Sequence, residues 1–115
     1  MKMIFKGGTP SGTVSTPPSK SHTHRAFFLA AMAKGRSTIT NVQMSEDTKA
    51  TLAACEAMGA KVTIEEGRNQ FEGQTVVIDG GDLHAPTSTV YTANSGTTMR
   101  LFTGIASMFD TAVTI

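Results

Sequence analysis

Cysteine, aromatic residues and long apolar runs are all scarce in this sequence of 115 residues. The single cysteine, Cys55, excludes a disulfide within the chain, and its apolar helical surroundings predict a small buried hydrophobe and not a reactive thiol. No apolar run reaches the ~18 residues that a membrane-spanning helix needs. The stretch 1–6 has no apolar core and no cleavage pattern, so we expect no signal peptide and a cytoplasmic location.

An excess of charge of one sign is lacking as well. Ten basic and nine acidic side chains leave a formal net charge of +1, and charged residues make up only 17% of the chain. This balance excludes a general basic field for nucleic acid or for a membrane surface, so we expect neither as a partner. Any binding of anions would have to be local.

Metal-ligand and nucleotide-binding patterns are also missing. His22 and His24 stand two residues apart and cannot share a helix face, while His84 stands alone. The sequence contains no CxxC or HExxH spacing, and neither GxxxxGK(S/T) nor GxGxxG. We therefore expect no protein-bound metal and no nucleotide cradle of these two types.

The hydrophobic patterns predict alternating helices and strands, and so an α/β (α+β) fold. Helices are expected from about Ser21 to Ala33, buried on most sides, from Ser45 as N-cap to a stop at Gly59, and from Ser95 to about Met108. Strands are expected at 37–42, 61–65 and 70–78, the last two forming an antiparallel hairpin around a turn at 66–69, with weaker strands at 3–5, 13–15, 90–92 and 112–115.

The order of these elements indicates a repeat. A strand near Val14 followed by helix, strand, helix and two strands makes a βαβαββ unit, and the pattern after Gly81 looks like the same unit beginning again. We therefore divide the chain into an N-terminal strand segment 1–15, a first unit 16–81 and the start of a second unit 82–115. Asp79 and Asp82 flank glycines and are interpreted as turn residues.

One stretch places positive charge where a helix start does not favour it. After the rigid Pro17–Pro18 come Lys20, Ser21 and Arg25, whereas the first turn of a helix normally carries Asp or Glu. A local rule broken twice in one place points to anion binding; the alternative is a pair of solvated side chains beside a Ser21 N-cap. Asp47, in the first turn of the next helix, is either a partner of the helix dipole or an active-site carboxylate.

A second stretch, Asn94–Arg100, repeats this layout. Gly96 lets backbone come close to a ligand, the amides of Gly96, Thr97 and Thr98 are expected to be unpaired, and Arg100 adds a charge one turn later. Taken alone, each stretch could be an ordinary capped helix start. Together they predict a ligand, or a pair of ligands, with more than one negative group.

These stretches resemble the 5-enolpyruvylshikimate-3-phosphate (EPSP) synthase family. Residues 18–26 are similar to its Pro-Gly-(Asp/Ser)-Lys-Ser-x-(Ser/Thr)-(His/Asn)-Arg-Ala motif, except that Ser19 directly follows Pro18 where many members have Gly and then Asp or Ser. Residues 41–48 resemble its Asn-Leu-x-x-Ser-(Asp/Glu)-Asp-(Thr/Val) motif, and 94–100 its Asn-(Ala/Ser)-Gly-Thr-(Ala/Thr)-Met-Arg loop. The Ala-Met-Gly-Ala at 57–60 also fits, so the resemblance covers nearly the whole chain.

The resemblance implies transfer of the enolpyruvyl group from phosphoenolpyruvate to the 5-hydroxyl of shikimate 3-phosphate, with release of phosphate and without metal or organic cofactor. By motif position, Lys20 would be catalytic and contact both substrates, and Ser21 and Arg25 would bind shikimate 3-phosphate. The residues expected to line or support the phosphoenolpyruvate site are Asn94, Gly96, Thr97 and Arg100, with Asp47 as a neighbour.

The resemblance also implies a fold of two lobes (an inside-out α/β barrel) built from repeated units, with segment 1–15 belonging to the other lobe. Because 111–115 ends on a strand-like pattern, we expect an N-terminal fragment, inactive alone, that lacks the acid/base carboxylates and self-associates through its uncovered surfaces. Three alternatives stay open: a stand-alone phosphate-binding module, a purely structural lobe, and an enzyme like UDP-N-acetylglucosamine enolpyruvyl transferase.

Overall fold

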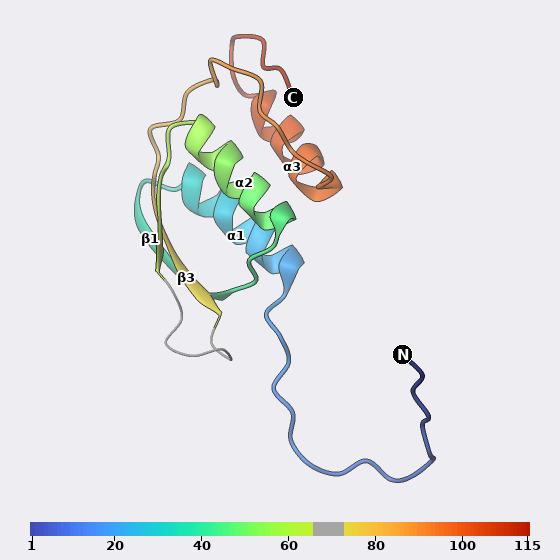
Figure 1. Cartoon of the computed structure of the whole chain (residues 1–115). Helices are drawn as coiled ribbons and strands as arrows, with labels where there is room; N and C mark the ends of the chain where they lie inside the picture. Colours follow the sequence, from blue (N-terminus) through green and yellow to red (C-terminus); the bar gives the residue numbers. More distant parts are fainter. Residues whose placement is uncertain (66–72) are drawn as a thin grey trace.

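The computed structural model describes residues 1–65 and 73–115 as a layered α/β arrangement with a long N-terminal arm (Figure 1). A three-stranded sheet forms one layer, α1 and α2 pack against it, and α3 packs against these two helices. The elements, in chain order, are α1 (Lys20–Met32), β1 (Gly35–Val42), α2 (Glu46–Ala57), β2 (Lys61–Glu65), β3 (Gln74–Gly80) and α3 (Gly96–Ala106).

The sheet has the order β1-β3-β2, and β3 runs antiparallel to both neighbours. Ile78 of β3 lies opposite Ser37 on one side and Val62 on the other. The predicted antiparallel hairpin is therefore confirmed over Lys61–Glu65 and Gln74–Gly80; the predicted turn at 66–69 and the residues up to 72 lie outside the described part. Since β1 and β2 are parallel to each other, α2 can serve as the crossover between them.

The interpretation of Asp79 as a turn residue is wrong. Asp79 lies within β3, opposite Arg36 of β1, and the two side chains form a bidentate pair. Arg36 Nε donates to Asp79 Oδ1 over 2.9 Å and Nη2 donates to Oδ2 over 3.0 Å. The flanking glycines suggested a turn, but cross-strand pairing with an opposite charge stabilises Asp79 in an extended strand.

The helix ends follow local sequence in α2. Ser45 is its N-cap, Glu46 and Asp47 occupy the first turn, and Gly59 follows the C-cap with φ +104°, as predicted. In α1 the expectation of burial on most sides is wrong at Leu29, which is 63% exposed. The α1 residues that are buried in the core are Phe27, Phe28, Ala30 and Ala31.

The core lies between the sheet and the helices and continues into the contact with α3. Val76 and Ile78 of β3 are fully buried in it, as is Met58 at the end of α2. The ring of Phe102 from α3 stacks on Phe28, with 6.4 Å between ring centroids and 10° between ring planes. This contact helps to hold α3 against α1 and so sets where the N-terminus of α3 lies.

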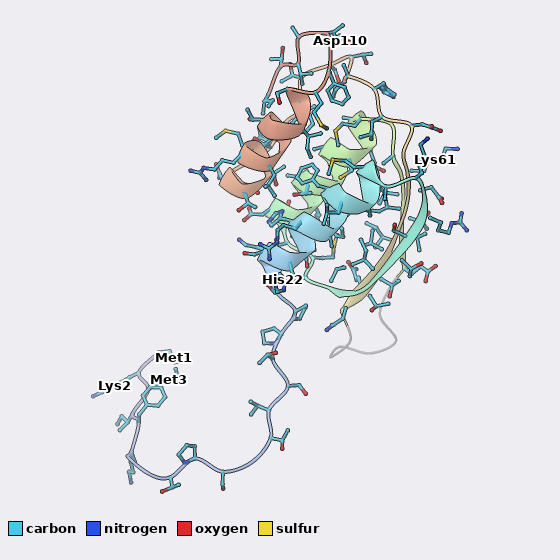
Figure 2. All side chains as sticks on the ribbon, turned by 180° about the vertical axis from the view of Figure 1, so that it is seen from behind. Met1, Lys2, Met3, His22, Lys61 and Asp110 are labelled. Atoms are coloured by element: carbon cyan, nitrogen blue, oxygen red, sulfur yellow. The ribbon has the colours of Figure 1, made fainter. Side chains whose placement is uncertain are left out.

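The four weaker predicted strands do not form. Residues 3–5 and 13–15 lie in the exposed arm, which carries Met1 and Met3 away from the helices (Figure 2). Residues 90–92 and 112–115 share only a hydrogen bond from the Val90 amide to the Thr114 carbonyl, over 2.9 Å. A strand needs a ladder of partners, and a β-like sequence pattern cannot supply the partner.

Cys55 is fully buried in α2, as predicted, and burial raises the pKa of its thiol to about 12. The thiolate is the reactive form, so the folded chain should react with a thiol reagent such as DTNB far more slowly than the same chain in urea. The measurement is the rate of thionitrobenzoate release under both conditions. Rapid stoichiometric release from the folded chain would contradict the burial of this side chain.

Among the described residues, no helix combines the length and the apolar character needed to cross a bilayer.

Candidate functional site

The three helices begin at the same end of the structure, close to Asp47 (Figure 1). Lys20, the first residue of α1, places its Nζ 2.7 Å from Asp47 Oδ2. Thr98, in the first turn of α3, donates its hydroxyl to the Asp47 carbonyl oxygen over 3.2 Å. The positive ends of three helix dipoles therefore meet around one residue, which favours the binding of an anion there.

Each helix is capped by a serine, and one of the three differs from prediction. Ser19, not Ser21, caps α1: its Oγ accepts from the His22 amide over 3.3 Å. Ser45 and Ser95 cap α2 and α3. Because Ser19 takes the capping role, Ser21 lies in the first turn with its side chain exposed. His22, labelled in Figure 2, marks this turn at the point where the arm meets the helices.

Ser95 pairs with one of the backbone amides that were predicted to be unpaired at the start of α3. The Thr98 amide donates to Ser95 Oγ over 3.2 Å, so it is not one of the unpaired amides. Of the three amides predicted to be unpaired, those of Gly96 and Thr97 have no hydrogen-bond acceptor among the described residues. A helix leaves its first few N–H groups without a partner inside the helix, and these two remain candidates for a ligand.

The first two turns of α1 and α3 carry three basic side chains, Lys20, Arg25 and Arg100, here called the basic cluster. Neither α1 nor α3 has an acidic residue in its first turn. Arg25 and Arg100 are exposed, and within residues 1–65 and 73–115 neither has an ion pair. A Cβ atom built on Gly96 would lie 2.7 Å from Arg100 Nη1, so the guanidinium lies directly over the glycine backbone.

Asp47 is the internal counter-ion of this cluster. The hydrogen bond from Lys20 is the main cause that holds the pKa of the Asp47 carboxyl below its usual value, so the carboxylate is charged at neutral pH. The Lys20 and Asp47 side chains are 46% and 30% exposed. An ion pair this open to water is only weakly favourable, and an incoming anion can replace the carboxylate beside Lys20.

The predicted site residues are thus distributed over three helix starts. The structure joins Lys20 and Asp47 directly and places Gly96 under Arg100. Asn94 and Thr97 are exposed beside this glycine. Ser21 and Arg25 are exposed on α1, and within the described residues their side chains have no hydrogen bond or ion pair with the other site residues. The sequence indicated two separate cradles, and Asp47 is the residue that connects them.

Sequence reasoning missed a buried polar group beneath this surface. His24, Thr51 and Thr98 are at most 1% exposed and hydrogen-bonded to one another. The available signal was threonine at two positions whose helical neighbours are apolar. Burial is the main cause that lowers the pKa of His24, so its imidazole is neutral at pH 7.

No group of three or more potential metal ligands occurs in the part of the chain that the structure describes. A groove of about 380 Å³ runs between α2 and the segment around Tyr91. Its lining is mostly alanine and other small or apolar residues, and none of the basic residues of the cluster lines it. The convergent helix starts are therefore the better candidate for a site that binds charged ligands.

Comparison with known proteins agrees on one family. The family described as EPSP synthase (3-phosphoshikimate 1-carboxyvinyltransferase) matches residues 5–115. The 3-phosphoshikimate 1-carboxyvinyltransferase of Methanocorpusculum labreanum is 46% identical over 113 residues, and that of Methanothermobacter thermautotrophicus is 46% identical over 107. These alignments cover 96% and 93% of this chain but 25% and 24% of the relatives, so the chain spans about a quarter of their length.

A solved structure supports the same relationship. The chain is similar to an EPSP synthase from Acinetobacter baumannii, with a TM-score of 0.65 and 38% sequence identity. The match covers 82% of this chain and 21% of that protein. The similarity therefore extends from sequence to fold over most of the described residues.

Proposed function

This chain belongs to the EPSP synthase family, and we propose that it forms part of the substrate site of a longer enzyme of that activity. The reaction moves the enolpyruvyl group of phosphoenolpyruvate to the 5-hydroxyl of shikimate 3-phosphate. The 5-hydroxyl loses its proton as its oxygen bonds to the central carbon of phosphoenolpyruvate, and the double bond opens as the terminal carbon takes up a proton, giving a tetrahedral intermediate. Loss of one proton from that methyl group then re-forms the double bond as the carbon–oxygen bond to phosphate breaks. The observation that carries the proposal is the meeting of three helix N-termini around Asp47, with Lys20 paired to it.

Lys20 is the residue proposed to act in the chemistry. It is the one basic side chain of the cluster whose counter-ion, Asp47, can be displaced by a ligand. Once a substrate phosphate or carboxylate replaces Asp47, the ammonium can stabilise charge that develops as phosphate leaves. The proposed role of Asp47 is to hold Lys20 in place before substrate arrives.

The remaining residues are proposed to divide between the two substrates. Ser21 and Arg25, on the exposed first turns of α1, suit the phosphate of shikimate 3-phosphate. At the start of α3, Gly96 offers a free amide and lets an anion come close to the backbone, supported by its neighbours Asn94, Thr97 and Arg100. This second group is proposed for phosphoenolpyruvate.

We propose that this chain supplies only part of the substrate site of the longer enzyme. Each substrate carries a phosphate and a carboxylate, more negative charge than Lys20, Arg25 and Arg100 can balance, so further basic residues and the acid/base groups must come from outside this chain. We further propose the division into 1–15, 16–81 and 82–115, in which the arm 1–15 pairs with a sheet of another lobe. Its exposed apolar side chains, among them Met3, Ile4 and Phe5, and its lack of any partner in the described residues support this.

The proposal is tested with the full-length protein that contains this chain. Phosphate release should require both phosphoenolpyruvate and shikimate 3-phosphate, and substituting UDP-N-acetylglucosamine for shikimate 3-phosphate should abolish it. Release with UDP-N-acetylglucosamine alone as acceptor would identify the related transferase instead. Absence of release with either acceptor, from a folded protein, would reject both activities.

A second candidate, a stand-alone phosphate-binding module, is favoured by one observation: the basic cluster lies entirely on this chain. Titration of the 115-residue chain with shikimate 3-phosphate, followed through the amide signals of Ser21 and Gly96, separates the two. Tight binding without the rest of the protein would support the module. No shift at millimolar ligand would dismiss it and leave the half-site interpretation.

A further inference from the structure

Four buried side chains form a continuous hydrogen-bonded chain that connects the three helices beneath the basic cluster. His24 Nδ1 of α1 lies 2.6 Å from Thr51 Oγ1 of α2, which lies 2.7 Å from Thr98 Oγ1 of α3. Thr98 Oγ1 is also 2.6 Å from Ser95 Oγ and 3.2 Å from the Asp47 carbonyl oxygen. All four side chains belong to residues that are 3% exposed or less.

The available hydrogen atoms indicate which nitrogen of His24 carries the proton. Apart from the long 3.5 Å approach of Thr51 Oγ1 to the Asp47 carbonyl oxygen, the four contacts need four hydrogens, and the hydroxyls of Thr51, Thr98 and Ser95 supply one each. The fourth can come only from His24 Nδ1. Thr51 then donates to Thr98, Ser95 donates to Thr98, and Thr98 donates to the Asp47 carbonyl, which uses both lone pairs of Thr98 Oγ1. With the proton on Nε2, one contact would lack a hydrogen.

The surroundings of Nε2 agree with this assignment. This atom is buried and has no hydrogen-bond partner among the described residues. An N–H group there would be a buried donor without an acceptor, which is rarer and costlier than a bare lone pair. Burial lowers the pKa of His24 and Lys20 lowers it further, while Asp47 acts in the opposite direction, so the neutral ring is favoured.

We propose that His24 is a positioning residue, whose Nδ1–H acts through Thr51 and Thr98 to hold the start of α3 in place relative to Lys20 and Arg25. Within the described residues, the other contact between polar side chains of α1 and α2 is the half-exposed Lys20–Asp47 pair, which a ligand can displace. The buried hydrogen bonds between His24, Thr51 and Thr98 stay intact when the Lys20–Asp47 ion pair opens. Its kinetic consequence depends on the proposed function, but its hydrogen bonding does not.

The first test needs no activity. In a ¹⁵N-labelled chain at pH 7, His24 should show a protonated Nδ1 and a bare Nε2, with exposed His22 as an internal comparison. At pH 6.5, the ordinary histidine pKa, more than half of His24 should remain neutral. A His24 that carries its proton on Nε2, or that is mainly doubly protonated at pH 6.5, would overturn the assignment.

The second test uses the full-length protein and two matched pairs of variants. Thr98→Val removes the central hydroxyl at constant shape and should raise the KM of at least one substrate about tenfold. Thr103→Val, on the same helix, removes an exposed hydroxyl that bonds only the Met99 carbonyl and should leave KM unchanged. His24→Asn retains an N–H donor near the position of Nδ1 and should stay near wild type, whereas His24→Leu should behave like Thr98→Val.

The outcomes separate this proposal from the proposed function. Wild-type KM in both Thr98→Val and His24→Leu would refute the positioning role, even if the enzyme is fully active. If Thr98→Val does not fold, the contrast between His24→Asn and His24→Leu decides. If the wild-type protein has no transferase activity, the proposed function fails, and the nitrogen spectra still decide whether the hydrogen-bonded chain exists.

Discussion

Lys20→Ala in the full-length protein should lower kcat/KM for enolpyruvyl transfer by roughly 10- to 150-fold, and Arg25→Ala should have an effect of the same order. Each change removes charge-assisted hydrogen bonds to substrate, worth ~1.5–3 kcal/mol apiece. For Lys20 part of the loss should fall on kcat, because its ammonium is proposed to stabilise charge on the departing phosphate. Steady-state kinetics with each substrate varied in turn measures both effects.

Lys49→Ala is the matched control for these two variants. Lys49 is also a lysine near a helix start at this end of the structure, but it pairs with Glu46 on the exposed face of α2. Its removal should leave kcat/KM near the wild-type value. If Lys20→Ala and Lys49→Ala were equally active, the cluster around Asp47 would not be the substrate site.

Gly80→Ala should destabilise the fold by about 3 kcal/mol, the upper end of the cost of overpacking a core. Gly80 ends β3 directly beneath α1, and a Cβ atom there would overlap the carbonyl oxygens of Ala30 and Ala31 and lie 2.8 Å from the Ala31 carbonyl carbon. These atoms belong to a helix backbone, and the Gly81 amide already donates to the Ala31 carbonyl over 3.0 Å. The helix can therefore yield only by moving away from the sheet.

Gly104→Ala is the same type of substitution, but we expect it to change the stability of the fold in the opposite direction. Gly104 lies inside α3, and no atom would lie within 4 Å of its added Cβ. Alanine has the higher helix propensity, so this change should stabilise the chain by about 0.5–1 kcal/mol. Urea denaturation of the 115-residue chain should show midpoints displaced in opposite directions. If both variants moved the urea midpoint by the same amount in the same direction, β3 and α1 would not pack as described.

The local features of the fold were predictable because their causes are local. Ser45, two carboxylates and Gly59 delimit α2, and the alternation in Lys61–Glu65 predicts a strand whose partner, β3, follows directly in the chain. The prediction for α1 is wrong at its start: the N-cap is Ser19 and not Ser21, and the helix begins one residue earlier than predicted. The helix begins at Lys20, where the side chain meets Asp47, a contact across 27 residues that the local pattern cannot show.

The predicted strands of the arm and of the C-terminal stretch failed for a related reason. Their sequences contain β-branched or aromatic residues, which favour strands, but a strand is stabilised by hydrogen bonds to a neighbouring strand. The described residues offer 3–5 and 13–15 no such neighbour, and offer Val90 only one bond to Thr114. Pattern is sufficient where the partner is close in sequence, as in the β2–β3 hairpin, and insufficient elsewhere.

The sequence by itself determined the chemistry of this protein: an unusual concentration of positive charge at two helix starts, the motifs around Lys20 and Gly96, and with them the family. Only the tertiary structure decided that the two starts lie together, each in contact with Asp47. It alone revealed the polar chain from His24 to Ser95, because its links join residues 27 and 47 positions apart. Side-chain types and local spacing are written in the sequence, whereas contacts over such distances exist only after the helices have packed.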